Sequence, residues 1–201
     1  MIIGIIDYQA SNFGSLTSAL QDLEIKHFVS SNPEEFARAD LILLPGVGSF
    51  YSGAINLRAS GLDETITTHS SLGKPILGIC LGMHLLASVG SEGGNANGLG
   101  LIPGEILKLQ PSPGFRVPHM GWDEIWNHEK KEFVYFAHSY FFSPDKSKET
   151  LILSTFESAG KNLPAQLQLG NISGIQYHPE KSGTTGLRIL KKTIKGLMQS
   201  S

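Results

Sequence analysis

Short apolar runs alternate with helical patterns through the first half of the chain. The runs are apolar at most positions, as in strands buried on both faces of a sheet, and they predict strands at residues 2–6, 26–29, 41–44 and 75–79. Helical spacing and capping residues between them predict helices at residues 12–23, 33–37, 52–57 and 62–70. Ser11 or Asn12 is the expected cap of the first helix. This alternation is typical of a parallel sheet covered by helices on both sides.

The pattern changes after residue 87. Residues 90–100 are rich in glycine and polar side chains, and no Lys-Ser or Lys-Thr pair follows as in a phosphate-binding loop, so we expect a plain connection. Further strands are predicted at residues 102–109, 133–137, 151–156, 165–169 and 172–177. Residues 186–198 have the pattern of an amphipathic closing helix. The expected fold is α/β, with a mostly parallel central sheet flanked by helices and an antiparallel or mixed extension.

The length and composition are those of one soluble globular domain spanning residues 1–201. The chain is 40% hydrophobic and 17% charged, with a net charge of −2, so no nucleic-acid partner is indicated. One cysteine forms no internal disulfide, and no cysteines and histidines cluster at zinc-site spacing, so we expect the reducing cytoplasm and no metal. The chain starts without signal-peptide features, and no apolar run reaches the roughly 18 residues that span a bilayer.

The only cysteine lies where a predicted strand turns into a helix. Gly78-Ile-Cys-Leu-Gly82 has the pattern of a nucleophile elbow, in which small residues two before and two after the nucleophile let the backbones pass closely. The helix N-terminus beneath Cys80 would favour its thiolate form. A small buried cysteine at the end of a core strand is the alternative. The elbow alone leaves both interpretations open.

A second chemical cluster follows the last predicted strand. His178 and Glu180 are separated by Pro179, which fixes the local turn so that both side chains can point toward one site. An imidazole can take the proton of a thiol and return it to a leaving amine, while a carboxylate orients the ring. Taken alone, this pair is a common feature of a solvated loop. Together with the elbow at Cys80, it favours a catalytic triad.

These motifs carry a resemblance to a known family. The Gly78–Gly82 elbow, His178-Pro-Glu180, the Pro45-Gly-Val-Gly48 turn and Asp7-Tyr8 resemble the class I, triad-type glutamine amidotransferases, whose fold is flavodoxin-like. More narrowly, several motifs that occur in the family's order over nearly the whole chain resemble the glutaminase subunits of imidazole glycerol phosphate synthases. These motifs are Gly98–Gly104, Pro118-His-Met-Gly-Trp122, His138-Ser-Tyr140 and His178-Pro-Glu-Lys-Ser-Gly183.

The resemblance implies hydrolysis of glutamine through a cysteine thioester, without a cofactor. Cys80 would attack the side-chain carboxamide, His178 would move protons and Glu180 would orient its ring. Backbone N–H groups would stabilise the oxyanion, and they are those of Leu81 and of the Val47–Gly48 turn. The residues expected to hold the substrate glutamine are Gly46, His84, His138, Ser139 and Tyr140.

The resemblance also implies a partner that consumes the ammonia. The family docks the glutaminase on a (β/α)₈-barrel cyclase as a heterodimer, and the cyclase makes imidazole glycerol phosphate and an aminoimidazole carboxamide ribotide in histidine biosynthesis. The residues expected to face this partner are Asn12, Pro118, His119, Met120, Trp122 and Tyr135. An exposed tryptophan is a plausible interface anchor. For Trp122, burial in the core is the alternative.

Three departures from the family pattern leave other functions open. His84 stands where the family usually has glutamine, Asp123 where asparagine commonly follows the tryptophan, and residues 9–11 differ from the usual Gly-Met-Gly. The imidazole of His84 would donate a comparable hydrogen bond, with a charge that varies near neutral pH. The alternatives are a paralogous glutaminase that supplies a cyclase-like partner in amidino-sugar synthesis for surface polysaccharides, and a catalytically silent regulatory partner.

Overall fold

A nine-stranded sheet runs through the whole molecule. The computed structural model describes residues 1–9, 13–145 and 150–199, and its main sheet has the order β2-β1-β3-β4-β13-β12-β11-β8-β9. The first five strands of this order are mutually parallel, and all of them except the edge strand β2 are mostly apolar, as expected for strands covered on both faces. They are β2 (Lys26–Ser30), β1 (Ile2–Ile6), β3 (Leu41–Leu44), β4 (Ile76–Ile79) and β13 (Ile172–Ile175).

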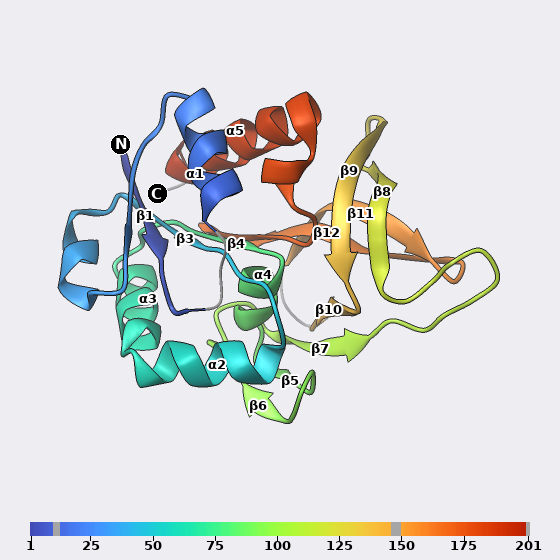
Figure 1. Cartoon of the computed structure of the whole chain (residues 1–201), viewed down its shortest axis with the longest axis horizontal. Helices are drawn as coiled ribbons and strands as arrows, with labels where there is room; N and C mark the ends of the chain where they lie inside the picture. The colour runs from blue at the N-terminus through green and yellow to red at the C-terminus, as the bar shows by residue number, and fades with distance from the viewer. Residues whose placement is uncertain (10–12, 146–149, 200–201) are drawn as a thin grey trace.

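Helices cover both faces of the parallel strands (Figure 1). One face carries α1 (Gly14–Asp22) and α5 (Gly183–Gln199). The opposite face carries α2 (Phe50–Ala59), α3 (Leu62–Ser71), α4 (Leu81–Leu85) and the 3₁₀ helix η1 (Pro33–Arg38). None of the described helices has both the length and the apolar character that a membrane crossing needs. The expected cap of the first helix, at Ser11 or Asn12, lies outside the described residues.

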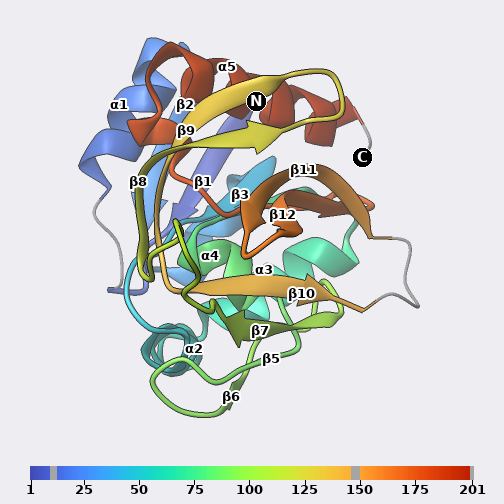
Figure 2. The same cartoon turned by 90° about the vertical axis from the view of Figure 1, so that its right-hand side faces the viewer.

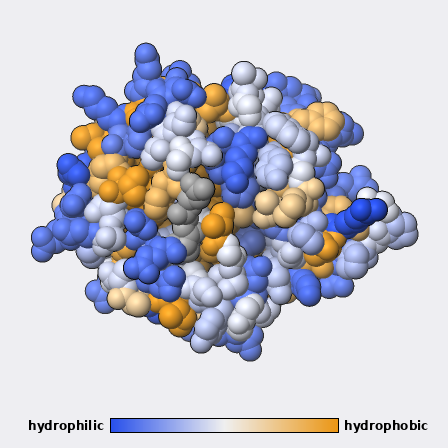
Figure 3. All heavy atoms as spheres, in the orientation of Figure 1, coloured by the Kyte–Doolittle hydropathy of each residue, from blue (hydrophilic) through white to orange (hydrophobic). Residues whose placement is uncertain are grey.

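Side-chain alternation along the strands divides the core in two. On β3, Leu41 and Leu43 pack under α1 and α5, whereas Ile42 and Leu44 pack against α2, α3 and α4. Each apolar residue of this strand is fully buried, so the strand contributes to both cores. Polar residues cover most of the surface seen in Figure 3, and the apolar side chains there form only small groups.

The C-terminal half extends the sheet with antiparallel strands. Their order continues from β13 through β12 (Lys161–Leu169), β11 (Leu151–Ser158), β8 (His119–Trp126) and β9 (Lys131–His138). A second sheet lies beside α2 and α4 (Figure 2). It consists of β10 (Tyr140–Pro144), β7 (Gly104–Lys108), β5 (Val89–Gly90) and β6 (Ala96–Asn97). The predicted α/β fold with a mixed extension is confirmed.

The structure corrects several predicted bounds. Strand β8 was not predicted, because its apolar residues Met120 and Trp122 point outward while His119 and Ile125 point inward. The expected plain connection at 90–100 contains β6 and the end of β5. Strand β12 begins at Lys161, four residues before the prediction, because it continues past Pro164 and still pairs with β11. Helix α1 begins at Gly14 rather than residue 12.

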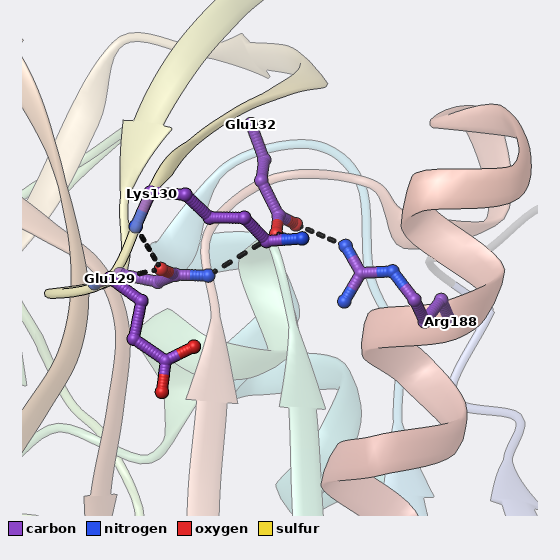
Figure 4. Close-up of polar contacts among 5 residues, drawn as sticks. Glu129, Lys130, Glu132 and Arg188 are labelled. Carbon is purple, nitrogen blue, oxygen red and sulfur yellow. Dashed lines mark hydrogen bonds and ion pairs between the residues drawn. The ribbon is translucent and has the colours of Figure 1, made fainter.

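An ion pair between a buried carboxylate and exposed cations attaches α5 to the antiparallel extension (Figure 4). Glu132 on β9 is buried and pairs with Arg188 on α5 and with Lys130, whose Nζ lies 2.7 Å from Glu132 Oε1. Burial alone would raise the pKa of Glu132, but these two cations outweigh it and lower the pKa. Helix α5 follows directly after the segment that carries His178, so the ion pair also restrains that segment.

We predict that Gly82→Ala destabilises the fold. A Cβ at residue 82 would lie 1.7 Å from the carbonyl oxygen of Leu44, and a backbone atom of a core strand cannot move aside without further cost. The free energy of unfolding should fall by at least about 1–3 kcal/mol in denaturant titrations. The control is Gly196→Ala in α5, where the new Cβ meets nothing within 4 Å among the described atoms. This substitution should raise the free energy of unfolding by about 0.5–1 kcal/mol. Equal stabilities for the two variants would contradict the close contact.

Candidate active site

Cys80 occupies a strained corner between β4 and α4. Its backbone has φ 54° and ψ −113°, which is uncommon for a residue other than glycine. Hydrogen bonds hold it there: its N–H donates to the carbonyl oxygen of Ile175 at 2.7 Å, and its carbonyl oxygen accepts from the N–H of His84 at 3.1 Å. The thiol side chain is buried, with 6% exposure. This is the geometry that the elbow pattern predicted.

The glycines on either side of Cys80 explain the spacing of the elbow. A Cβ on Gly78 would lie 2.7 Å from backbone atoms of Gly82 and Met83. A Cβ on Gly82 would strike the carbonyl oxygen of Leu44 at the end of β3. The strand, the corner and the helix therefore pass one another at distances that only glycine permits.

His178 lies next to Cys80 because β4 and β13 are adjacent parallel strands. Ile79 and Ile175 are register partners, so both chain segments leave the sheet at the same edge. His178 Nδ1 donates to Glu180 Oε1 at 2.8 Å, and the Cys80 side chain also interacts with the ring. Burial alone would lower the pKa of His178, but hydrogen bonds with Cys80 and Glu180 outweigh it and raise the pKa to about 10. A proton on this ring is thus favoured beside the sulfur.

Two residues for which the sequence did not predict this role, Tyr135 and Ser182, hold the backbone of His178. Its N–H donates to the carbonyl oxygen of Tyr135 at 2.9 Å. The hydroxyl of Ser182 donates to the carbonyl oxygen of His178 at 2.6 Å and accepts from the N–H of Tyr135 at 2.9 Å. The position of Ser182 two residues after Glu180 was visible in the sequence, but its hydrogen-bond partner on β9 was not.

The Pro45–Gly48 turn forms one wall of the same site. The buried hydroxyl of Tyr8 donates to the carbonyl oxygen of Pro45 at 2.9 Å, and a Cβ on Gly46 would lie 2.1 Å from that hydroxyl. Gly48 has φ 104°, which favours glycine. Pro45, Gly46 and Val47 line a cavity of about 20 Å³ together with His178 and Glu180. The turn therefore faces the histidine and the carboxylate of the triad.

His84 is buried beneath the elbow and faces Gln176. The two side chains lie 2.8 Å apart, between His84 Nε2 and Gln176 Oε1. Because the amide oxygen only accepts, His84 donates from Nε2. Burial lowers the pKa of His84 to about 4 despite this hydrogen bond. The expectation that its charge varies near neutral pH is therefore wrong, since the ring is neutral there.

His138 and its neighbours form the bend between β9 and β10. His138 is buried, its Nδ1 donates to the carbonyl oxygen of Tyr140 at 2.7 Å, and burial lowers its pKa well below the ordinary value. The carbonyl oxygen of Ser139 accepts from the N–H of Leu109 at 2.9 Å. Tyr140 opens β10 and is half-buried. The backbone of this bend is therefore fixed on both sides.

The class I glutamine amidotransferase family model matches residues 4–196. The chain belongs to the class I glutamine amidotransferases. Several curated relatives named imidazole glycerol phosphate synthase subunit HisH are similar to it over nearly their whole length. The protein of Carboxydothermus hydrogenoformans is 40% identical, with 93% of this chain and 96% of that protein covered. The protein of Listeria innocua is 42% identical, with coverages of 94% and 93%.

Solved structures show the same fold at low sequence identity. A structure described as a glutamine amidotransferase is 16% identical and superimposes with a TM-score of 0.80, over 99% of this chain and 100% of that one. A structure described as PurLQS from Thermotoga maritima is 18% identical with a TM-score of 0.75, over 98% of both chains. These likenesses concern the fold alone.

The expected partner face of this amidotransferase is largely exposed, with one correction. Met120 and Trp122 are 66% and 58% exposed, so the alternative of a buried Trp122 is excluded. Pro118 is exposed, and Tyr135 lies edge-on to Trp122 with 6.3 Å between ring centroids. His119 is buried because strand alternation turns its side chain inward. Asn12 lies outside the described residues. No group of three metal-ligating side chains occurs within the described ranges.

We predict that Glu180→Gln lowers the pKa of His178 from about 10 toward 6.5, because it removes one of the groups that raise it. A raised pKa in the folded state stabilises the protein fully below 6.5 and loses this contribution as the pH rises toward 10. The stability difference between the amidotransferase and the variant should therefore narrow across that range. Histidine NMR and unfolding titrations measure both effects. Glu64→Gln on α3 is the control, and a shift of the same size there would contradict the assignment.

Proposed function

We propose that this chain is the glutaminase subunit of an imidazole glycerol phosphate synthase. It hydrolyses glutamine to glutamate and ammonia and passes the ammonia to a (β/α)₈-barrel cyclase in histidine biosynthesis. The observation that carries the proposal is the convergence of Cys80, His178 and Glu180 at one sheet edge. Relatives of about 40% identity that carry this name over more than 90% of both chains support it.

The triad supplies the chemistry in two halves. The sulfur of Cys80 attacks the carboxamide carbon of glutamine, and the proton held by His178 passes to the nitrogen that leaves as ammonia. Water then attacks the thioester, His178 takes a proton from it, and the sulfur leaves as glutamate is released. Glu180 keeps the ring oriented through its hydrogen bond to Nδ1, which leaves Nε2 for proton transfer.

Backbone donors stabilise the oxyanion in both halves. Leu81 follows the nucleophile in the first turn of α4, where N–H groups have no partner within the helix. The second donor comes from the Val47–Gly48 turn, of which Val47 lines the cavity next to His178. Removal of one such donor typically lowers kcat by a factor of about 10²–10³.

The remaining substrate contacts come from buried, ordered elements. Gly46 lets the turn approach the elbow, and the bend at His138, Ser139 and Tyr140 presents backbone groups for the α-amino and α-carboxylate ends of glutamine. His84 takes the place of the usual glutamine as a neutral ring that donates to Gln176. His84 therefore acts on the substrate glutamine indirectly, through the side chain of Gln176, which it holds by a hydrogen bond.

The decisive experiment couples the chain to its proposed partner. The chain is mixed with a histidine-pathway cyclase, its ribulosyl aminoimidazole-carboxamide substrate and glutamine, and imidazole glycerol phosphate is measured. We expect product that depends on glutamine and on both subunits. Coupling only to another cyclase-like synthase would instead favour the paralogous pathway, and complex formation without glutamine hydrolysis would favour a silent regulatory partner.

We predict that Cys80→Ser abolishes glutamine hydrolysis by the complex and leaves complex formation intact. The fold does not depend on the sulfur, and serine fits the same corner, but its hydroxyl is a far weaker nucleophile. Glutamate release and the affinity for the cyclase are measured on the same preparation. Ammonia supplied directly should still sustain product formation, which shows that the cyclase is intact. Full hydrolysis by the variant would place the nucleophile elsewhere.

We predict that Trp122→Ala weakens binding to the cyclase by about 10-fold or more, which is typical of a central interface tryptophan. Trp122 is 58% exposed and lies in the middle of β8, opposite Tyr135, whose carbonyl oxygen accepts from the N–H of His178. Trp126→Ala is the matched control, because Trp126 is exposed on the same face of the same strand but farther from the site. Equal losses from the two variants, measured by calorimetry, would contradict this location of the interface.

A further inference from the structure

A chain of hydrogen bonds runs from the expected partner face to the expected substrate bend. Asp123 Oδ2 lies 2.8 Å from His119 Nε2, and His119 Nδ1 lies 3.1 Å from His138 Nε2. His138 Nδ1 then donates to the carbonyl oxygen of Tyr140 at 2.7 Å. His119 and His138 are register partners on β8 and β9, so the two rings meet across the strand pair.

The series of hydrogen bonds ends in an acceptor on each side, the carboxylate of Asp123 and the carbonyl oxygen of Tyr140. These two acceptors determine how many protons the series needs. The carbonyl oxygen of Tyr140 only accepts, so His138 Nδ1 carries a proton, and a neutral His138 accepts at Nε2. His119 then donates from Nδ1, and a neutral His119 would turn the lone pair of Nε2 toward the carboxylate of Asp123. Two acceptors 2.8 Å apart need a proton between them. When every one of these hydrogen bonds is made, the three side chains therefore hold one proton more than a carboxylate and two neutral imidazoles.

The surroundings separate this proton from solvent on all sides but one. His119 is buried and packs on Phe136 and Phe156, with ring centroids 4.3 and 5.2 Å away. The described titratable groups around the two rings are Asp123 on β8, His84 on α4 and His178 beyond β13. The Asp123 side chain is 44% exposed, and its Oδ1 accepts from the N–H of Glu124 at 2.7 Å. Asp123 is thus the only member of the three that reaches solvent.

We propose that Asp123, His119 and His138 form a proton-holding relay that positions the peptide of Tyr140 for glutamine binding. Asp123 and His119 are positioning residues in this relay, since they act through His138. The inference rests on the proposed function for the role of the His138–Tyr140 bend. It adds a route by which an event on the partner face, where Asp123 adjoins Trp122, reaches the substrate-binding backbone.

Asparagine at residue 123 is a matched test of the relay. Its amide nitrogen donates to His119 Nε2, so every hydrogen bond of the chain is made without the extra proton. In the natural protein, with aspartate at residue 123, burial lowers the pKa of His119 more than Asp123 raises it. The relay is therefore complete at mildly acidic pH and loses its proton below the ordinary histidine pKa as the pH rises. In Asp123→Asn it stays complete throughout.

The first measurement follows the ring nitrogens of His119 by NMR in the full chain. At pH about 5, both nitrogens should carry protons in the natural protein, whereas Nε2 should be unprotonated in Asp123→Asn. Glu124→Gln is the control, because Glu124 bonds to Lys131 outside the relay, and it should behave as the natural protein. The same His119 protonation in all three proteins across the titration would overturn the proton count.

The second measurement tests positioning through the kinetics of the complex with the cyclase. As the pH rises through the NMR midpoint of His119, the KM for glutamine in the natural protein should rise about two- to tenfold relative to Asp123→Asn, the range expected for one hydrogen bond. The ratio of their kcat values should stay constant. An unchanged KM ratio would show that the relay is only structural. Absence of glutamine hydrolysis in the natural complex would instead reject the proposed function and leave the NMR result standing.

Discussion

The parallel pairing of β4 with β13 is the constraint on which the site depends. It places the end of the cysteine strand beside the end of the histidine strand, and it also supplies the carbonyl oxygen of Ile175 that holds Cys80 in its strained conformation. Gly174 also lets α4 pack closely on β13, because a Cβ there would lie 2.5 Å from Met83 Cγ. One strand pair therefore brings the nucleophile and the base together and also shapes the corner.

Burial and charge act in opposite directions on the histidines around this pair. His84, His119 and His138 are buried, and burial lowers the pKa of each, even that of His119, which contacts the carboxylate of Asp123. His178 is also buried, yet Cys80 and Glu180 raise its pKa. The site thus concentrates its positive charge on the one ring that can deliver a proton to a leaving amine. Neutral neighbours keep that charge from being repelled.

The sequence predicted the parts of the protein that local pattern determines. The apolar runs predicted β1, β3 and β4, and the glycine spacing around Cys80 predicted the elbow. It missed β8, because a strand whose tryptophans face outward does not show the usual alternation. It could not pair His119 with His138, since that contact depends on the register of β8 and β9 rather than on spacing along the chain. Nor could it pair Ser182 with Tyr135, since that contact depends on how the segment after β13 packs against β9.

The position of β13 in the sheet also governs when the site forms during synthesis. This strand is the last in the chain but lies in the middle of the sheet, between β4 and β12. Until it emerges from the ribosome, β4 has an open edge, the antiparallel strands are detached from the parallel ones, and Cys80 has no base beside it. A nascent or truncated chain without β13 therefore has no complete triad. It does not release ammonia before the fold is finished.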